Sequence, residues 1–97
     1  MRVIAKKPLR EFWDKHPDAE DALKAWHAEA SSASWLTPAD VKARYGTASI
    51  LKNGRVVFNI CGNKYRLVVK INYKMAIILI RFIGRHVDYD AVNAEEI

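Results

Sequence analysis

The sequence predicts an α+β domain whose helices pack on one face of an antiparallel sheet of four to five strands. Apolar side chains recur at the three-to-four-residue spacing of helices in residues 9–30. From residue 47 onward, β-branched and aromatic runs are separated by turn-forming dipeptides, which is typical of strands joined by hairpins. Because these strands follow one another without intervening helices, antiparallel pairing is favoured. At 97 residues the chain is expected to form a single domain, residues 1–97.

The N-terminal part of the chain predicts a short strand and two helices. Residues 2–5, RVIA, favour an edge strand that ends before a helix starting at Pro8. The apolar stripe of that helix comprises Leu9, Phe12, Trp13 and His16. Pro17 ends the helix, and Asp18 can cap the next one with Asp21 in the capping-box position. The apolar face of the second helix comprises Ala19, Ala22, Leu23, Trp26 and Ala30. The two tryptophans are expected to anchor the core.

A third, short helix is followed by the first strand of a hairpin. Its start signal comprises Thr37 as N-cap, Pro38 in the first turn, Asp40 as capping-box partner and a contact of Leu36 with Val41. Gly46 closes this helix. Residues 47–51 are strand-like, and Asn53-Gly54 is the strongest hairpin signal of the chain because both residues tolerate positive φ.

Residues 55–90 contain two more reversals, and these fix a strand register. Gly62-Asn63 suits a two-residue type II′ hairpin, and Lys74-Met75 marks the second reversal. The expected pairs are Ile60 with Tyr65, Asn59 with Arg66, Phe58 with Leu67, Val56 with Val69, Val69 with Ile80 and Leu67 with Phe82. Side chains alternate between the two faces of a strand, so this register also assigns each residue to a face.

The expected core face carries Val56, Phe58, Ile60, Tyr65, Leu67, Val69, Ile71, Ile78, Ile80 and Phe82. The opposite face carries Asn59, Arg66, Lys70 and Arg81, with Val68, Ile77, Leu79 and Ile83 between them. In this register Arg66 and Arg81 are diagonal neighbours on adjacent strands. Two like charges so placed repel unless an anion lies between or over them. The sequence therefore predicts an anion-binding site on this face.

The charge of the chain is unevenly distributed. The formal net charge is +5, yet no acidic residue lies between Asp40 and Asp88, a segment that contains ten lysines and arginines. An electropositive surface of this kind favours a phosphate-bearing partner. The alternative is a solvated basic face that binds nothing.

Composition argues against several classes of protein. No apolar run approaches the roughly 18 residues that span a bilayer, and the N-terminus lacks the apolar stretch of a signal peptide. We therefore expect a cytoplasmic protein without a membrane partner. Cys61 is the only cysteine, and no spacing of His, Cys, Asp and Glu is typical of a zinc or magnesium site, so we expect neither a metal nor another cofactor. His16 and His27 lie among helix residues, and Asp18 and Asp21 are interpreted as helix-start residues.

Two segments of the basic half are similar to a known family. FNICGNKYRLVVKINY and IRFIGRHVDYD resemble the HigB-type toxins of the RelE superfamily, and the similarity extends to MRVIAKKPLREFW and to the Thr-Pro-Ala-Asp-Val-Lys helix. The resemblance implies a single RelE-like toxin domain and a ribosome-dependent endoribonuclease that cleaves mRNA. It also implies a type II toxin–antitoxin pair, with a HigA-like helix-turn-helix antitoxin as the partner that inhibits the toxin.

The resemblance carries over to individual residues. Arg66 in YRLV corresponds to the phosphate-binding arginine of the superfamily, His86 to an arginine or histidine that takes part in cleavage, and Tyr89 to a C-terminal aromatic residue. Several relatives have lysines on the strand before Gly62, where this sequence has Val57 and Asn59. The general base therefore stays open among His86, Lys70 and Lys64.

RNA can be cleaved without a metal when its own 2′-hydroxyl attacks the neighbouring phosphate. A base, an acid and cations that neutralise the phosphate are then needed. The candidate catalytic residues are His86, Arg66, Arg81 and Tyr89, with Asp88 or Asp90 to orient His86. The candidate RNA-binding residues are Lys64, Lys70, Asn59 and Arg85.

Two other functions are compatible with the charge. A non-catalytic RNA- or ribosome-binding module would share every electrostatic feature of a nuclease. A DNA-binding regulator is less favoured because no helix is basic enough to enter a major groove. For the antitoxin, we predict packing on the helical side, around residues 7–26, or on a sheet edge.

Overall fold

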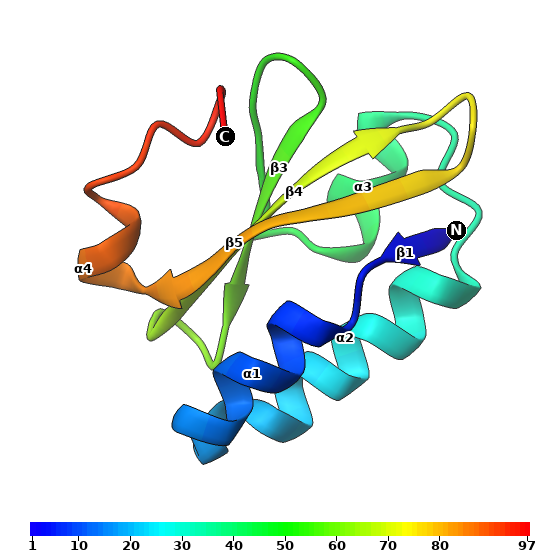
Figure 1. Cartoon of the computed structure of the whole chain (residues 1–97). Coiled ribbons are helices and arrows are strands. Elements are labelled where there is room, and N and C mark those ends of the chain that lie inside the picture. The colour runs from blue at the N-terminus through cyan, green and yellow to red at the C-terminus, as the bar shows by residue number, and fades with distance from the viewer.

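A computed structural model describes all residues, 1–97, and shows helices α1 and α2 side by side against one face of a twisted sheet (Figure 1). The elements are, in order, β1 (Arg2–Ile4), α1 (Lys7–Lys15), the 3₁₀ helix η1 (Pro17–Ala19), α2 (Glu20–Ser32), α3 (Pro38–Arg44), β2 (Ser49–Ile50), β3 (Arg55–Ile60), β4 (Tyr65–Asn72), β5 (Ile77–Arg85) and α4 (His86–Tyr89). The predicted α+β class is confirmed. No helix is both long and apolar enough to cross a membrane.

The sheet has five strands in the order β1-β5-β4-β3-β2. The pairs β2–β3, β3–β4 and β4–β5 are antiparallel, whereas β1 lies parallel to β5, so the sheet is mixed. The chain reaches β5 from β1 only after α1, η1, α2, α3 and three other strands. Because α1 follows β1 directly and β1 pairs with β5, α1 packs against β5.

Most helix termini follow the sequence, although Leu36, predicted to pack on Val41, is 75% exposed. Thr37 and Asp40 form the predicted capping box of α3. Asp18, however, does not cap α2, because η1 intervenes and the N-cap is Ala19 without a side-chain hydrogen bond. The prediction of Asp18 as an N-cap with Asp21 as its box partner is wrong. Pro17 starts the extra turn, and this frees the Asp18 carboxylate for contacts with the sheet.

The predicted register of β3 and β4 is confirmed throughout, including Asn59 opposite Arg66 and Ile60 opposite Tyr65. In the hairpin before β3, Asn53 and Gly54 have positive φ of 59° and 72°, as the Asn-Gly signal predicted. The pairing of Val69 with Ile80 is also confirmed.

From Val68 back to Tyr65, the predicted register of β4 with β5 is wrong. The next pair is Val68 with Phe82, so Arg81 is an extra residue in a β-bulge. Leu67 consequently faces Ile83 instead of Phe82. The bulge moves Phe82 off the predicted core face and brings Ile83 onto it, since one inserted residue reverses the alternation of side chains.

The main core lies between the helices and one face of the sheet. Its buried side chains include Leu9 and Trp13 of α1, Leu23 and Trp26 of α2, Val41 of α3, and Val56, Phe58, Leu67, Val69 and Ile78 of the sheet. Trp13 and Trp26 are 7% and 2% exposed, which confirms their prediction as core anchors. Burial of this apolar face stabilises the packing of the helices on the sheet.

A second, smaller cluster covers part of the opposite face of the sheet. Val57 and Val68 are buried there together with Ala94, and Leu51, Phe82, Tyr89 and Ile97 pack around them. The C-terminal segment after β5 is held by the Arg55 guanidinium, whose Nε and Nη2 donate to the Ile97 carbonyl at 2.9 and 2.6 Å. The face that the sequence predicted to be an open cationic surface is thus partly covered by residues 86–97.

Candidate functional site

A cleft of about 570 Å³ opens where three parts of the chain meet. The end of α1 and η1 contribute Lys15, His16, Pro17 and Asp18; the β3–β4 hairpin contributes Lys64 and Tyr65; and the junction of β5 with α4 contributes Arg85, His86 and Val87. The cleft therefore combines residues from the beginning, middle and end of the sequence. Three of the eight predicted site residues line it: Lys64, Arg85 and His86.

Asp18 connects the helical wall of the cleft to the hairpin. Its carboxylate accepts a hydrogen bond from the Tyr65 hydroxyl at 2.6 Å and forms an ion pair with Lys64. The Cys61 thiol donates to the Asp18 carbonyl oxygen at 3.2 Å. Hydrogen bonds from Lys64 and Tyr65 hold the pKa of Asp18 below its ordinary value, and the same contacts raise the pKa of both donors.

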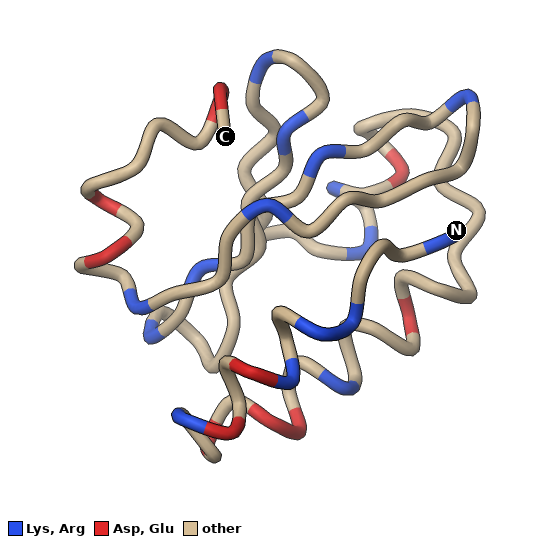
Figure 2. The backbone as a smooth tube through the Cα atoms, in the orientation of Figure 1, with Lys and Arg blue, Asp and Glu red and all other residues tan.

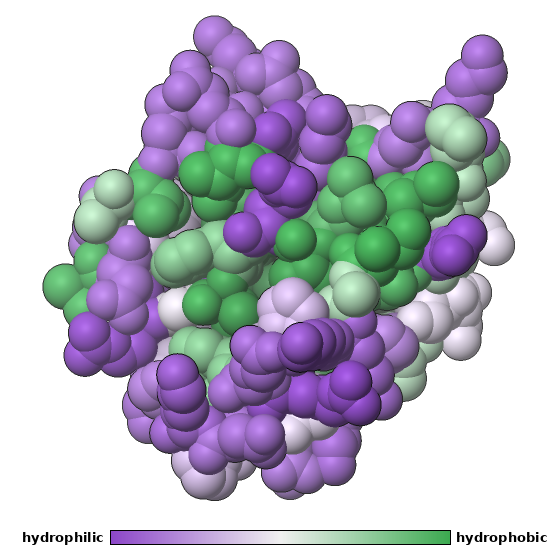
Figure 3. Space-filling model, in the orientation of Figure 1, coloured by the Kyte–Doolittle hydropathy of each residue, from purple (hydrophilic) through white to green (hydrophobic).

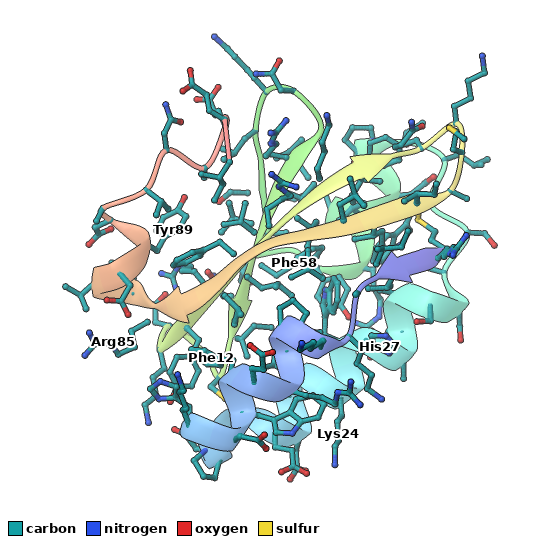
Figure 4. All side chains as sticks on the ribbon, viewed as in Figure 1. Phe12, Lys24, His27, Phe58, Arg85 and Tyr89 are labelled. Atoms are coloured by element: carbon teal, nitrogen blue, oxygen red, sulfur yellow. The ribbon has the colours of Figure 1, made fainter.

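An aromatic cluster fixes the second side chain of this wall. The His16 ring is stacked on Phe12, with centroids 4.4 Å apart and planes inclined by 24°. Tyr65 contacts both rings, at 5.1 Å from Phe12 and 5.5 Å from His16. Phe12 points from α1 toward the sheet in Figure 4. His16 is half-buried, and its ring nitrogens are not used in a hydrogen bond or ion pair within the protein.

His86 lies on the opposite wall, at the start of α4. Its backbone N–H donates to the Lys64 carbonyl at 3.1 Å, which attaches α4 to the hairpin. Nδ1 of His86 lies 3.4 Å from Oδ2 of Asp90. Of the two carboxylates predicted to orient His86, Asp90 is therefore the one beside it.

Asp88 is engaged elsewhere. Its two oxygens accept from Nε and Nη2 of Arg85 at 2.9 and 3.0 Å, a bidentate pair that also caps α4. The Arg85 hydrogen bond holds the pKa of Asp88 below its ordinary value, and the charge of His16 makes a small contribution in the same direction.

Arg66 and Arg81 do not form the predicted diagonal pair. The bulge places Arg66 opposite Gly84, and Arg81 is exposed at the bulge itself. Arg66 is only 9% exposed, and its guanidinium donates to the carbonyl and Oδ1 of Asn63 at 3.0 and 2.8 Å. The predicted anion site between two adjacent arginines is wrong because one inserted residue separates them.

The remaining predicted residues lie along the face opposite the helices. Lys70 is exposed on β4, and Asn59 is half-buried on β3, with its amide directed to the Thr47 carbonyl at 3.5 Å. Tyr89 packs into the second cluster and points from α4 toward the sheet (Figure 4). Their roles, like those of the cleft residues, stay predictions.

Sequence reasoning missed His16, Asp18 and Lys15 as site residues and assigned Tyr65 to the core alone. Tyr65 is indeed 2% exposed, yet its hydroxyl reaches the cleft wall. The available signal was the His-Pro-Asp sequence at the end of α1. It marks a helix end but does not say which part of the sheet that end faces.

Charge in and around the cleft favours an anionic ligand. Lys and Arg lie on the strands, on the hairpins and on α1, whereas no strand or hairpin carries Asp or Glu (Figure 2). Apolar side chains form a band along β5 between these polar regions (Figure 3). No three His, Cys, Asp or Glu side chains come together as a set of metal ligands.

Comparison with known proteins agrees with the resemblance seen in the sequence. A family model described as HigB_toxin, the RelE-like toxic component of a toxin–antitoxin system, matches residues 19–92. The mRNA interferase HigB of Escherichia coli O6:H1 is 25% identical over 95 residues, which cover 96% of this chain and 92% of that protein. The mRNA interferase toxin HigB of Escherichia coli K12 is 26% identical over 96 residues, covering 97% and 92%. Because the family match covers most of the chain, this protein belongs to the HigB family of RelE-like toxins, the toxic components of toxin–antitoxin systems.

Proposed function

We propose that this toxin is an endoribonuclease that cleaves mRNA on the ribosome, by attack of the 2′-hydroxyl of the RNA and without a metal ion. The names of its relatives, mRNA interferases, support the substrate and the reaction. The observation that carries the proposal for this chain is His86, a proton-transfer side chain in a cleft with Lys15, Lys64 and Arg85. We propose the cytoplasm as the place of action because ribosomes and mRNA are there.

RNA binding follows from the cations of the cleft and of the sheet face. Lys64 and Arg85 are paired with Asp18 and Asp88, and both pairs are exposed, so a phosphate can share these cations at little cost. Beyond the cleft, Asn59, Lys70, Arg66 and Arg81 are proposed to contact RNA that continues along the face opposite the helices. Tyr89 is proposed to support this path through its packing on the sheet.

The chemical step needs two proton transfers. The 2′-oxygen forms a bond to phosphorus while the bond from phosphorus to the 5′-oxygen breaks. One group takes the proton of the 2′-hydroxyl and another supplies a proton to the 5′-oxygen, which leaves a cyclic phosphate and a 5′-hydroxyl. His86 performs one of these transfers, and the Asp90 carboxylate lies 3.4 Å from its Nδ1.

Induction of the toxin without its antitoxin tests this function. Growth should stop, and primer extension should reveal new 5′ ends within translated messages. Unimpeded growth with intact messages would contradict the proposal.

Arg66→Ala should weaken both RNA binding and cleavage, whereas His86→Ala and Tyr89→Phe should leave binding intact. Cleavage that is unchanged in both of the latter variants would contradict a role of His86 and Tyr89 in the chemistry, whereas RNA or ribosome binding without any cleavage by the wild-type protein would favour a non-catalytic binding module.

A toxin of this family has an antitoxin partner, and we propose a HigA-like helix-turn-helix protein that packs outside the cleft. The outer faces of α1 and α2 carry the ion pairs Lys7–Glu11 and Lys24–Glu20. Both edge strands expose an isoleucine, Ile4 on β1 at 37% and Ile50 on β2 at 39%. Of the two predicted positions, the sheet edge therefore has the stronger support.

Salt dependence distinguishes these positions from the cleft. Apolar packing on an edge should keep its affinity as ionic strength rises, whereas binding across the cationic cleft should weaken steeply. Calorimetric titration of toxin with antitoxin at low and high salt measures this difference. A steep loss of affinity with rising salt would place the antitoxin over the cationic face. Slower hydrogen exchange around Arg66 in the toxin–antitoxin complex would support the same placement.

A further inference from the structure

Two of the three histidines of the chain line the same cleft, although they lie far apart in the sequence. His86 lies on the wall formed by α4, and His16 lies on the wall formed by the end of α1. The third histidine, His27, belongs to α2 and is not part of the cleft. Two imidazoles on opposite walls of a cationic cleft are the arrangement that a reaction with two proton transfers needs.

The direction of the reaction explains why one histidine is insufficient. In an in-line displacement the attacking 2′-oxygen and the departing 5′-oxygen lie on opposite sides of the phosphorus. A single side chain cannot be within hydrogen-bond distance of both oxygens in the same transition state. The second proton-transfer group must therefore lie across the bound phosphate from His86, and His16 is the ionisable imidazole on that wall.

The His16 ring is held in place and yet available. It is stacked on Phe12 at 4.4 Å and lies against the Tyr65 ring at 5.5 Å, so its plane is restricted before substrate binds. Tyr65 is itself fixed by its 2.6 Å hydrogen bond to Asp18. The ring nitrogens of His16 keep no partner within the protein. A side chain needed only for packing gains nothing from such free, partly exposed nitrogens at a cleft wall.

The surrounding charges differ between the two histidines and assign their roles. Near His16 are Lys15, Asp18, Lys64 and the Arg85–Asp88 pair, and both carboxylates are already matched by cations. His86 has the same cations near it but also has Asp90 beside Nδ1 at 3.4 Å. The Asp90 carboxylate can accept a hydrogen bond from Nδ1–H of a charged imidazole, and this leaves Nε2–H to face the substrate.

We infer that His16 is the general base and His86 the general acid of the cleavage reaction, an inference that rests on the proposed ribonuclease function. His16 accepts the proton of the 2′-hydroxyl as its oxygen bonds to phosphorus. His86 gives its proton to the 5′-oxygen as the bond from phosphorus to that oxygen breaks. Lys15, Lys64 and Arg85 neutralise the non-bridging oxygens, and the products are a 2′,3′-cyclic phosphate and a 5′-hydroxyl.

Two substitutions separate proton transfer from packing. His16→Phe keeps an aromatic ring against Phe12 and Tyr65, and His16→Gln keeps polarity and approximate size, but neither can act as a base. Single-turnover cleavage of a synthetic message on purified ribosomes should slow by about 10²- to 10⁴-fold in both variants. His27→Phe is the matched control and should cleave at the wild-type rate. A wild-type rate in His16→Phe would reduce His16 to a packing residue and overturn the inference.

The assignment of base and acid has its own test. A message with sulfur in place of the 5′-bridging oxygen at the cleaved bond carries a leaving group that needs no proton. This substrate should restore cleavage by His86→Ala and leave His16→Phe slow. The wild-type rate should rise and then fall with pH, and His16→Phe should lose the rising part. If the sulfur-substituted message restored cleavage by His16→Phe instead, the role of His16 as the base would be contradicted.

Failure of the inference and failure of the proposed function give different results. A wild-type protein that cuts no message on or off the ribosome contradicts the function. A wild-type protein that cleaves, with His16 variants that cleave equally fast and with the same pH profile, contradicts only the role of His16. Circular dichroism and ribosome binding of each variant show whether it has kept its fold.

Discussion

Gly84 lies under the ring of Phe82, and a methyl group added there has no room. Gly84 is buried on β5, opposite Arg66, and its backbone does not require positive φ. An alanine Cβ would lie 2.5 Å from Cζ of Phe82 and 3.1 and 3.3 Å from the two Cε atoms. Carbon atoms pack best at about 3.5–4.0 Å, so the ring must move by roughly 1 Å.

The cost of this movement can be worked out against a control. Phe82 packs on the cluster of Val57, Val68 and Ala94, and pushing it away costs about 1–3 kcal/mol of unfolding free energy. Any glycine-to-alanine change also gains about 0.4–1 kcal/mol by restricting the unfolded chain. Gly46 has no atom within 4 Å of an added Cβ and also needs no positive φ. Gly46→Ala should therefore show the entropic gain alone.

Urea denaturation followed by circular dichroism measures both variants. Gly84→Ala should be less stable than Gly46→Ala by about 1–3 kcal/mol, because the entropic gain is common to both. In a Phe82→Ala background the added methyl group at position 84 should cost almost nothing. A difference below about 0.5 kcal/mol between the two glycine variants would refute the packing of Phe82 over Gly84, and with it the β-bulge that brings Phe82 to this face.

Three further predictions concern the cleft wall and the two clusters. Because Lys64 and Tyr65 hold the pKa of Asp18 below its ordinary value of 3.8, its stabilising effect is complete above about pH 4 and is lost as the pH falls through the lower folded-state value. Asp18→Asn should thus be less stable than wild type at pH 7, with a gap that narrows in urea titrations at pH 3, and a constant gap would contradict the contacts of Asp18. Arg55→Ala removes two charge-assisted hydrogen bonds to the Ile97 carbonyl, so amide hydrogen exchange of residues 94–97 should become at least about tenfold faster. Unchanged exchange would show that packing alone holds this segment. Tyr73→Phe should leave the urea midpoint unchanged or raised because the buried hydroxyl has no partner, whereas a clear loss of stability would reveal one.

The parts of the fold that the sequence predicted depend on local signals. Gly62-Asn63 sets the length of one loop, and the period of two then determines every pair of β3 and β4. The bulge at Arg81 escaped prediction because no Gly or Pro marks it and the run IILIRFI is apolar on both faces. The burial of Ala94 could not be predicted either, since one small residue after a short helix has no periodicity.

The candidate site was predictable where its residues lie in one motif. His86, Arg85 and Lys64 belong to the two HigB-like segments, and the pairing of β4 with β5 brings them together. His16 and Asp18 come from the first helices, and their place opposite His86 depends on the parallel pairing of β1 with β5. That pairing spans nearly the whole chain, and no local pattern specifies it.

The chemistry of the RNA ends produced by the purified toxin tests the central claim most directly. A synthetic message translated on purified ribosomes is cleaved, and the new ends are analysed by mass spectrometry. A 2′,3′-cyclic phosphate on one fragment and a 5′-hydroxyl on the other are predicted, with both absent for His86→Ala although this variant still binds the ribosome. Fragments with 5′-phosphates, or equal cleavage by His86→Ala, would contradict a toxin that cuts RNA through its own 2′-hydroxyl in this cleft.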